Sequence, residues 1–589
     1  MPKLPILTPR AQTRLTTDTF LGLDRRETVP DGGWAETENL SLRCRPAMAP
    51  RPPRGTVITL RSPGGLCAKD ALCYVEGGAL YINGSPTPIT GLADHPRQLV
   101  GMGANLILWP DRVYYNTADP TDYGSIDADW PYTGDVRVRF CRADGSLWPA
   151  APAVSEAEPQ EPENLELWLD TSGGGRVLRQ YSASLQLWTE IETPYVRLDF
   201  FTQGQIPRLF KALDGVTVSG GPEEALEGEK ILYALGGGEG EADYIVLSAL
   251  PAGEGLHENQ SLRLTRRAPD MDFLCQCGNR LWGCFYGNDG EQNLNEIYGC
   301  ALGDFKNWRQ YLGLSTDSYA ASVGSDGPWT GAAGYLGSPV FFKADRLHRL
   351  SISASGAHRL TETVCRGVQK GSHKSLCVVG ETLFYQSDSG VCAWQGGFPE
   401  GVSAALGEEK ADSAVGGALG ESYYLSRRRA GGGWELLVFD TQTGLWLRQD
   451  ALHVADFANA DGELYALDAD TGAVLSLTGR AGTLESAVSW AAVTGDKHYI
   501  SPDRKYPGRL DLRLRLSPGS AVRVLLSYDG AGVWTEAGGL SAPAGAETAT
   551  VLRLPVRPRR CDSYRLRLEG TGDVRMLSLT QVLERGSDL

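Results

Sequence analysis

Short runs in which apolar and polar residues alternate recur along most of this chain. Such runs have the two-residue period of a β-strand with one buried face. Between them stand turns that contain Gly, Asn or Asp, the residues that tight turns favour. Few stretches keep the 3.6-residue apolar period of a helix beyond two turns, which excludes a helical bundle. The pattern predicts an all-β protein built from many short strands.

Between about residues 65 and 480 the runs form a loose repeat, in which a strand, a turn and a second strand rich in Tyr or Trp follow one another. We count seven copies. Once the block 134–266, which breaks the rhythm, is set aside, about 40 residues remain for each copy, close to the size of a four-stranded propeller blade. We therefore predict a seven-bladed β-propeller. Examples of the predicted strands are 71–75, 79–82, 105–109, 280–284, 382–385, 434–440 and 463–467.

The remaining segments differ in composition from the repeat. The block 134–266 opens on a run rich in Pro and Glu and then alternates again, which indicates a small inserted β-domain. From about 485 leucine alternates with charged residues, as expected for an antiparallel sandwich with one wet face. We predict five segments: an extended N-terminal arm (1–60), blades one and two (61–133), the inserted domain (134–266), blades three to seven (267–480) and a C-terminal β-sandwich (481–589).

Composition excludes several classes of protein. The 72 Gly are accompanied by 14 Trp, 23 Tyr and 14 Phe, so a disordered low-complexity polymer is excluded. The net charge of −16 argues against a basic coat for nucleic acid, although an acidic wall would let DNA slide through a duct without adhering. No apolar run has the length of a membrane span, and none near Met1 resembles a secretory signal. We expect no membrane span and synthesis in a cytoplasm.

The sequence contains none of the short motifs that mark common catalytic, metal-binding or phosphate-binding sites. There is no H-E-x-x-H, no G-x-S-x-G elbow and no phosphate-binding loop, and no two of the seven His have ligand spacing. Four cysteines, Cys275, Cys277, Cys284 and Cys300, lack paired C-x2-C spacing and are expected to be core thiols. We therefore expect no catalytic residues, no metal, no cofactor and no enzymatic activity. A propeller glycosidase stays open, because its carboxylates would be distant in sequence.

Two basic segments stand out in this acidic chain. The loop 366–375 carries Arg366, Lys370, His373 and Lys374, which are candidates for contact with phosphate or an acidic partner. As an alternative, the loop is a solvated connection between two blades. The triplet Arg427–Arg428–Arg429 precedes three glycines and is expected at a hairpin tip. Residues 527–534 resemble an Asp-box hairpin. The motif occurs once and lies outside the predicted propeller, so we expect an ordinary β-turn there.

Several segments together resemble a protein common in phages and prophages of Firmicutes. They are residues 279–284, 302–308, 314–320, 323–327 and 366–375 and the ending 558–589. The arm, with residues 29–32, 38–40 and 50–52, resembles the lead-in of other phage propeller proteins. The resemblance implies a virion structural protein of a tailed phage, similar to the packaged-DNA stabilisation or tail-nozzle proteins of short-tailed phages. That family has no catalytic residues to carry over to this sequence.

The resemblance implies a tail nozzle, hub or neck component, located in the virion, that retains packaged DNA and conducts it during ejection. The expected partners are further copies in a homo-oligomeric ring, taken to be a hexamer, portal or adaptor proteins, tail-fibre proteins, and DNA passing through the channel without sequence-specific binding. Two alternatives stay open. One is a receptor-binding tail protein that recognises a glycan, and the other is a glycosidase built on the propeller.

Overall fold

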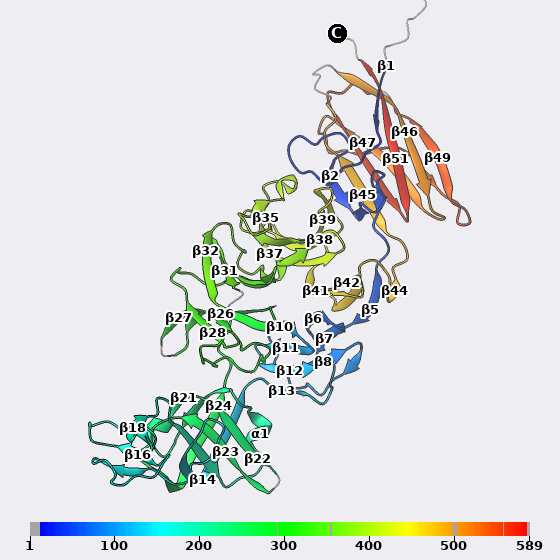
Figure 1. The fold of residues 1–589 in the computed structure, drawn as a ribbon. Coiled ribbons are helices and arrows are strands. Elements are labelled where there is room, and N and C mark those ends of the chain that lie inside the picture. Colours follow the sequence, from blue (N-terminus) through cyan, green and yellow to red (C-terminus); the bar gives the residue numbers. More distant parts are fainter. Residues whose placement is uncertain are drawn as a thin grey trace, which may run out of the picture.

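The structure is a computed structural model that describes residues 12–238, 240–290, 292–353, 356–498, 504–557 and 559–585. Three β-rich bodies lie in a row, with the inserted domain at one end, the propeller in the middle and a sandwich at the other end (Figure 1). The described residues contain one short α-helix, α1 (Ile206–Leu209), and, elsewhere in the chain, three 3-10 turns. The prediction of an all-β protein is confirmed. None of the described helices has the length and hydropathy needed to cross a bilayer.

The propeller consists of seven antiparallel sheets that follow one another along the chain. In the first six sheets the strands pair in sequence order, as in a meander, and the inner strands of neighbouring sheets contact one another around a ring. The first three sheets are β6 (Pro63–Lys69), β7 (Ala71–Glu76), β8 (Ala79–Ile82) and β9 (Ser85–Pro86); β10 (Gln98–Met102), β11 (Asn105–Trp109), β12 (Val113–Asn116) and β13 (Tyr123–Ser125); and β25 (Phe273–Cys277), β26 (Arg280–Asn288), β27 (Asn293–Gly299) and β28 (Tyr319–Ser322).

The last four sheets complete the ring. They are β29 (Gly331–Tyr335), β30 (Ser338–Lys343), β31 (Arg346–Ile352) and β32 (His358–Val364); β33 (Cys377–Val379), β34 (Thr382–Ser387), β35 (Gly390–Trp394) and β36 (Glu400–Gly401); β37 (Ala411–Leu419), β38 (Ser422–Arg429), β39 (Trp434–Asp440) and β40 (Leu445–Arg448); and β41 (Val454–Ala460), β42 (Glu463–Asp468), β43 (Ala473–Ser476), β5 (Gly55–Thr59) and β44 (Thr483–Leu484). The turns η2 (His373–Ser375) and η3 (Ala404–Leu406) lie before β33 and β37.

The seventh sheet is closed by a strand from the other end of the propeller sequence. Strand β5 pairs with β43, with Ile58 opposite Val474. Because β5 is followed directly in the chain by β6 of the first sheet, this pairing ties the start of the propeller sequence to its last sheet, and the ring cannot open without breaking a strand pair. The segment 1–60, expected as an extended arm, is thus divided in the structure: β5 belongs to the propeller, and earlier strands belong to the sandwich. Residues 1–11 of that segment lie outside the described residues.

Glycine lets the inner strands of neighbouring sheets approach closely. A Cβ atom at Gly334 in β29 would lie 2.2 Å from the carbonyl oxygen of Gln276 in β25. In the sixth sheet, a Cβ at Gly417 would lie 2.7 Å from the ring of Phe457. Separations this short are steric clashes, so part of the high glycine content of the chain is needed for packing around the propeller axis.

Apolar side chains between neighbouring sheets form the propeller core. Cys275, Cys277 and Cys284 pack in one cluster with Trp282 and Phe341, whereas Cys300 belongs to a neighbouring cluster. All four thiols are buried, and burial raises the pKa of each of them, that of Cys300 to about 12. They are therefore neutral thiols that fill space in two cores.

The inserted domain leaves the second sheet and returns to the third. Its main sheet has seven antiparallel strands in the order β21-β20-β24-β14-β19-β23-β22, and a smaller sheet, β15 to β18, is attached to it. Its elements are β14 (Ala128–Cys141), β15 (Ala153–Ser155), β16 (Leu167–Asp170), β17 (Val177–Ser182), β18 (Leu187–Glu190), β19 (Tyr195–Phe200), α1, β20 (Gly215–Ser219), η1 (Glu224–Leu226), β21 (Gly228–Ile231), β22 (Ala234–Gly238), β23 (Glu241–Ser248) and β24 (Gly255–Arg266).

The C-terminal body is a sandwich of two antiparallel sheets, β1-β51-β46-β49 and β2-β45-β50-β47-β48, to which the N-terminal segment supplies an edge strand on each side. The leucines of β46 that alternate with charge, from Leu510 to Leu516, point into its core and are at most 2% exposed. The segment resembling an Asp-box forms the turn after β47. The strands are β1 (Gln12–Thr17), β2 (Trp34–Glu38), β3 (Leu40–Ser41), β4 (Ala49–Pro50), β45 (Ser489–Thr494), β46 (Lys505–Leu516), β47 (Ala521–Tyr528), β48 (Thr535–Ser541), β49 (Thr548–Pro555), β50 (Tyr564–Thr571) and β51 (Val574–Arg585), β3 and β4 forming a separate pair. Pro558 and residues 586–589, part of the ending used in the sequence comparison, lie outside the described residues.

Candidate functional site

The structure separates the four predicted binding residues. Arg366 and Lys370 are exposed on the loop that precedes η2, whereas His373 and Lys374 are half-buried at the propeller axis. There they line a pocket of about 380 Å³ between the inner strands, together with Cys67, Asp456 and Phe457. Two of the predicted residues therefore share a cavity, and the other two lie on the surface.

The charge of Lys374 is compensated inside this axial pocket. Its ammonium lies 2.5 Å from the carboxylate of Asp456 and 3.2 Å from the carbonyl oxygen of Ala455. The second carboxylate oxygen of Asp456 accepts the backbone N–H of Leu66 at 3.3 Å. Burial raises the pKa of Asp456 above its usual value, although Lys374 opposes this shift. The ion pair joins the turn η2 to the seventh sheet and leaves the pocket without net charge from these two residues.

His373 brings no charge to the pocket at neutral pH. Burial, and to a smaller extent the charge of Lys374, lower the pKa of its imidazole to about 4. Its ring lies against Phe273 of β25, with 5.1 Å between the ring centres. A neutral imidazole in a ring contact is a poor partner for phosphate. Contact with phosphate through Arg366 and Lys370 stays a prediction.

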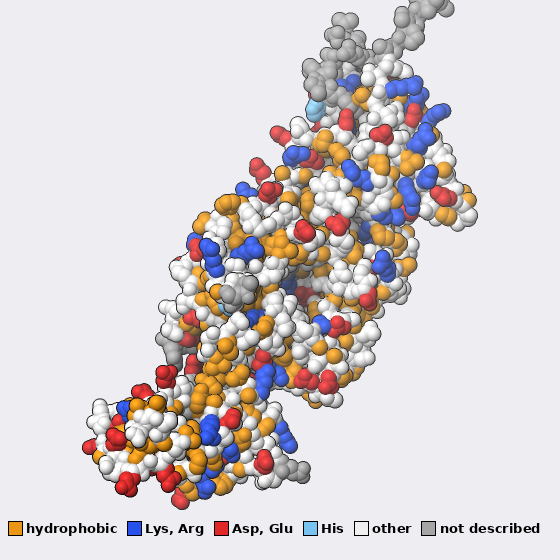
Figure 2. Space-filling view, in the orientation of Figure 1, with side chains coloured by type: hydrophobic (Ala, Val, Ile, Leu, Met, Phe, Trp, Pro, Cys, Tyr) orange, Lys and Arg blue, Asp and Glu red, His pale blue; other side chains and the backbone are white. Residues whose placement is uncertain are grey.

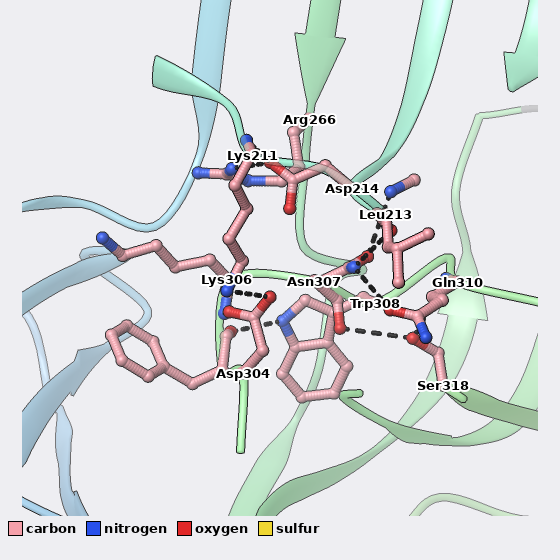
Figure 3. Close-up of polar contacts among 12 residues, drawn as sticks. Lys211, Leu213, Asp214, Arg266, Asp304, Lys306, Asn307, Trp308, Gln310 and Ser318 are labelled. Atoms are coloured by element: carbon pink, nitrogen blue, oxygen red, sulfur yellow. Dashed lines mark hydrogen bonds and ion pairs between the residues drawn. The ribbon is translucent and has the colours of Figure 1, made fainter. Parts of the chain in front are cut away.

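Where the inserted domain meets the loop of the third sheet, side chains from both form a polar junction (Figure 3). The side-chain amide of Asn307, from the loop between β27 and β28, reaches across to the inserted domain. Its oxygen accepts the backbone N–H of Gly215 at 3.1 Å, and its nitrogen donates to the carbonyl oxygen of Leu213 at 2.8 Å. Asn307 is 1% exposed, so these bonds form away from water.

Ion pairs surround this amide. Asp214, which is fully buried, pairs with Arg266 at the end of β24, and Lys211 lies 2.7 Å from Asp304 of the propeller loop. Burial raises the pKa of Asp214, with Arg266 opposing the shift. The bonds of Asn307 and the pair of Lys211 with Asp304 connect the inserted domain to the propeller, although Asp214 Oδ1 and Arg266 Nε have no hydrogen-bond partner within the described residues. The junction therefore holds the inserted domain at a defined position against the third sheet.

A cleft of about 550 Å³ opens beside this junction, between the inserted domain and the third sheet. Hydrophobic side chains gather on the visible face where the propeller approaches the inserted domain (Figure 2). Large pockets that combine apolar walls with a few polar groups are the usual form of ligand sites. The cleft is lined by four aromatic residues (Phe285, Tyr298, Trp308 and Tyr311), four acidic residues (Glu229, Asp270, Asp289 and Glu296) and two arginines (Arg267 and Arg309).

The aromatic and acidic side chains of the cleft are close partners. Burial, together with the nearby carboxylate of Glu296, raises the pKa of Tyr298 well above its usual value. Glu296 accepts from the hydroxyl of Ser322 at 3.1 Å. Tyr311 is 50% exposed. The cleft therefore offers an accessible ring beside oriented carboxylates, and Tyr298 stays protonated.

Residues on the two walls of the cleft are also tied together. Arg309 of the propeller loop pairs with Glu229 of β21, and Asp270 pairs with Arg112 of the second sheet. No local sequence pattern indicates this site, because its residues come from segments that are far apart in sequence. One signal was available: residues 302–308 and 314–320, which are prominent in the sequence resemblance, form the loop that carries Asn307 and flanks the cleft.

The chain is similar to solved structures but matches neither a family model nor a curated protein. Similar structures include a protein assigned as a 6-phosphogluconolactonase from Bacteroides fragilis (11% identity, 70% of this chain and 96% of the other, TM-score 0.24). Others are the sialidase of Trypanosoma rangeli (10% identity, 69% and 94%, TM-score 0.23) and the endosialidase of phage phi92 (10% identity, 80% and 70%, TM-score 0.21). At these identities and TM-scores the similarity gives no substrate or catalytic residue.

One sequence-based prediction is corrected by this comparison. The chain was predicted not to be an enzyme because it lacks local catalytic motifs, yet the similar structures are mainly glycoside hydrolases, among them sialidases and a galactanase. The physical reason for the error is that glycoside hydrolysis uses carboxylates that converge in space from distant parts of a chain. The absence of a short motif therefore does not exclude an activity.

Proposed function

We propose that this protein recognises a glycan in the cleft between the third sheet and the inserted domain. The observation that carries the proposal is that one pocket of about 550 Å³ contains both an exposed aromatic ring, that of Tyr311, and the carboxylate of Glu296, which the hydroxyl of Ser322 orients. A sugar ring presents C–H groups on its faces, which pack on aromatic rings, and hydroxyls at its edge, which donate to carboxylates. The cleft supplies both kinds of partner.

The polar junction supports the same proposal, because binding is stronger when the site does not have to be ordered first. Asn307 fixes the inserted domain by two buried hydrogen bonds, and Arg309 connects the two walls. The walls thus keep their spacing without a ligand. Among the functions considered from the sequence, this proposal corresponds to the glycan-recognising tail protein. The hypothesis of a tail nozzle that assembles as a ring and conducts DNA stays a prediction.

The test is a binding measurement on the full chain. Bacterial surface polysaccharides and oligosaccharides are screened on an array, and hits are measured by isothermal titration calorimetry with wild-type protein and Tyr311→Ala. Loss of an aromatic contact is expected to weaken binding about three- to tenfold. Tyr123→Ala is the matched control, since Tyr123 is a similarly exposed tyrosine (44%) on the outer strand of the second sheet.

The result that would contradict the proposal is equal binding by the Tyr311→Ala and Tyr123→Ala proteins, or no binding of any glycan. Release of reducing ends is followed in the same samples. Release that is lost in Glu296→Gln would extend recognition to hydrolysis, because a carboxylic acid or carboxylate is then needed for the reaction.

A further inference from the structure

A third pocket lies between the sixth sheet of the propeller and the C-terminal sandwich, and its lining is rich in arginine. Strand β40 of the sixth sheet contacts β2 of the sandwich, and Thr37 and Arg448 are hydrogen-bonded there. The pocket has a volume of about 280 Å³, and Arg25, Arg429, Arg448 and Arg567 line it. Four guanidinium groups in one pocket are notable in a chain with a net charge of −16.

The arginine triplet of the sequence supplies part of this pocket. Arg427, Arg428 and Arg429 are the last three residues of β38, and the turn to β39 follows them. Because side chains alternate along a strand, Arg427 and Arg429 point to one face and Arg428 to the other. Arg428 is exposed, Arg427 is 1% exposed, and Arg429 lines the pocket.

Positive charge exceeds negative charge on this side of the pocket. Arg25 and Arg427 share one buried carboxylate, that of Glu435, at 2.6 and 2.8 Å. Burial of Glu435 raises its pKa, but the bonds and charges of the two arginines outweigh burial and the net pKa is lowered. Glu409 lies 3.7 Å from Arg25 and 3.8 Å from Arg429. Three guanidinium groups thus share two carboxylates.

Hydrogen-bond donors remain unused at this position. Within the described part of the chain, the buried Nε of Arg429 and the buried Nη2 of Arg427 have no hydrogen-bond partner. Buried donors without partners are rare and costly, and they point to an unseen acceptor. Arg448 is set into the pocket by Thr37 of β2, whose hydroxyl donates to the Arg448 carbonyl oxygen at 3.2 Å and accepts its N–H at 2.9 Å.

The other acidic residues of the pocket lining accept no hydrogen bond from these two arginine nitrogens. Glu36 and Glu38 are exposed, and Glu36 lies 3.5 Å from Arg565, outside the pocket lining. Arg567 pairs with Glu569, which belongs to the neighbouring groove. The planar fork of a guanidinium matches the oxygens of carboxylate, phosphate or sulfate.

We propose that this pocket binds an oxyanion, the phosphate, sulfate or carboxylate group of a small molecule or sugar, through Arg429 and Arg448 with Arg25 and Arg567 around it. The site is separate from the glycan cleft and does not depend on it. A bound anion would contact β38 of the propeller and β50 of the sandwich together, and so couple the two bodies. The volume exceeds that of an inorganic anion, which leaves room for a carrier molecule.

Isothermal titration calorimetry on the full chain tests the proposal. Sodium sulfate, sodium phosphate and sodium glucuronate are titrated against sodium chloride at matched ionic strength, with glucose as the neutral counterpart of glucuronate. Saturable binding of at least one oxyanion is expected. Glucuronate binding without glucose binding would identify an anionic sugar as the ligand class, and binding of sulfate or phosphate alone would identify a free anion.

Variants assign the binding to the pocket. Arg429→Gln and Arg448→Gln are each expected to weaken binding by about tenfold or more, because a charge-assisted bond is lost. Arg448→Lys keeps the charge without the fork and is expected to weaken binding less. The control is Arg480→Gln, which removes an exposed arginine that does not line the pocket. Circular dichroism and thermal midpoints in chloride verify that each variant is folded.

Two results would overturn the proposal. One is the absence of any oxyanion binding above that of chloride. The other is equal weakening by Arg480→Gln and the two pocket variants, which would indicate a general effect of surface charge. Neither result bears on the glycan cleft, whose test uses different residues.

Discussion

The ammonium of Lys374 lies 2.5 Å from the carboxylate of Asp456 at the axis of the propeller. The two residues come from different sheets, since Lys374 belongs to η2 before the fifth sheet and Asp456 to β41 of the seventh. Their pairing converts a basic loop, which the sequence presents as a candidate for contact with a ligand, into a bond that spans the axial pocket. Two predictions follow from this region of the molecule.

Replacing Lys374 by Met is expected to lower the thermal stability of the propeller. The change leaves the carboxylate of Asp456 in a pocket with its main cation removed, and an unpaired carboxylate in such a place is unfavourable. Because Lys374 is 30% exposed, solvent screens part of the loss, and we expect about 1–2 kcal/mol. The midpoint of thermal unfolding checks this.

The double variant Lys374→Met, Asp456→Asn provides the control for that measurement. If the ion pair is responsible, the double variant should be more stable than Lys374→Met alone, since no buried charge remains unpaired. Equal losses in the two proteins would show that the aliphatic part of Lys374, rather than its charge, stabilises the axis.

The pKa of His373 predicts a defined pH dependence of stability. Its folded pKa of about 4 lies below the usual 6.5, so between these values the unfolded chain binds more protons than the folded chain. The stability that His373 contributes is therefore present above about pH 6.5 and is lost as pH falls toward 4. Asp456, which shares the axial pocket and has a raised pKa, contributes with the opposite sign in acid.

The His373 effect is separated from that of other titrating groups by a difference measurement. Thermal midpoints of wild-type protein and His373→Phe are compared at a series of pH values from 4 to 7. Phe keeps the ring against Phe273 but cannot take up a proton. The stability difference is expected to shift in favour of the variant as pH falls, and a difference that is constant with pH would contradict the assignment.

The sequence allows the strand pattern to be predicted better than the closure of the fold. The predicted strand 105–109 coincides with β11, and 463–467 with β42, because each is a short apolar run beside a turn. For β5 the sequence predicts only part of an extended arm. Its partner β43 lies at the other end of the propeller sequence, and no local pattern indicates such a pairing. The strands β1 and β2 of the sandwich were missed for the same reason.

The candidate site shows the same limit. Lys374 could be singled out as a basic residue in an acidic chain, but Asp456, which cancels its charge, is distant in sequence. Glu229 and Tyr311 form parts of one cleft although the chain between them leaves the inserted domain and enters the third sheet. The local pattern of apolar residues shows which face of a strand is buried, but it does not show which loops lie next to one another in the fold.

Asn307→Ala is expected to loosen the inserted domain. The substitution leaves the Gly215 N–H and the Leu213 carbonyl without their partner at a buried junction, at a cost of about 1–3 kcal/mol for each unsatisfied group. Hydrogen–deuterium exchange of residues 211–218 should become faster while exchange in the sandwich is unchanged. Asn459→Ala is the control, because Asn459 is exposed and donates to the carbonyl of Ala418 within the propeller. Unchanged exchange at 211–218 would show that the junction does not depend on this amide.

Gly334→Ala is expected to destabilise the propeller more than an added methyl group does elsewhere. The new Cβ would lie 2.2 Å from the carbonyl oxygen of Gln276, which is backbone and cannot rotate away, so β29 and β25 must separate. Overpacking of this kind costs about 1–3 kcal/mol or more. At Gly324, by contrast, an added Cβ meets no atom within 4 Å, and its φ lies outside the left-handed region. Thermal midpoints of Gly334→Ala and Gly324→Ala should therefore differ by about 1–5 °C, since about 1 kcal/mol corresponds to roughly 1–2 °C in a protein of this size. If the two variants unfold at the same temperature, the inner strands have more freedom to separate than the spacing at Gly334 implies.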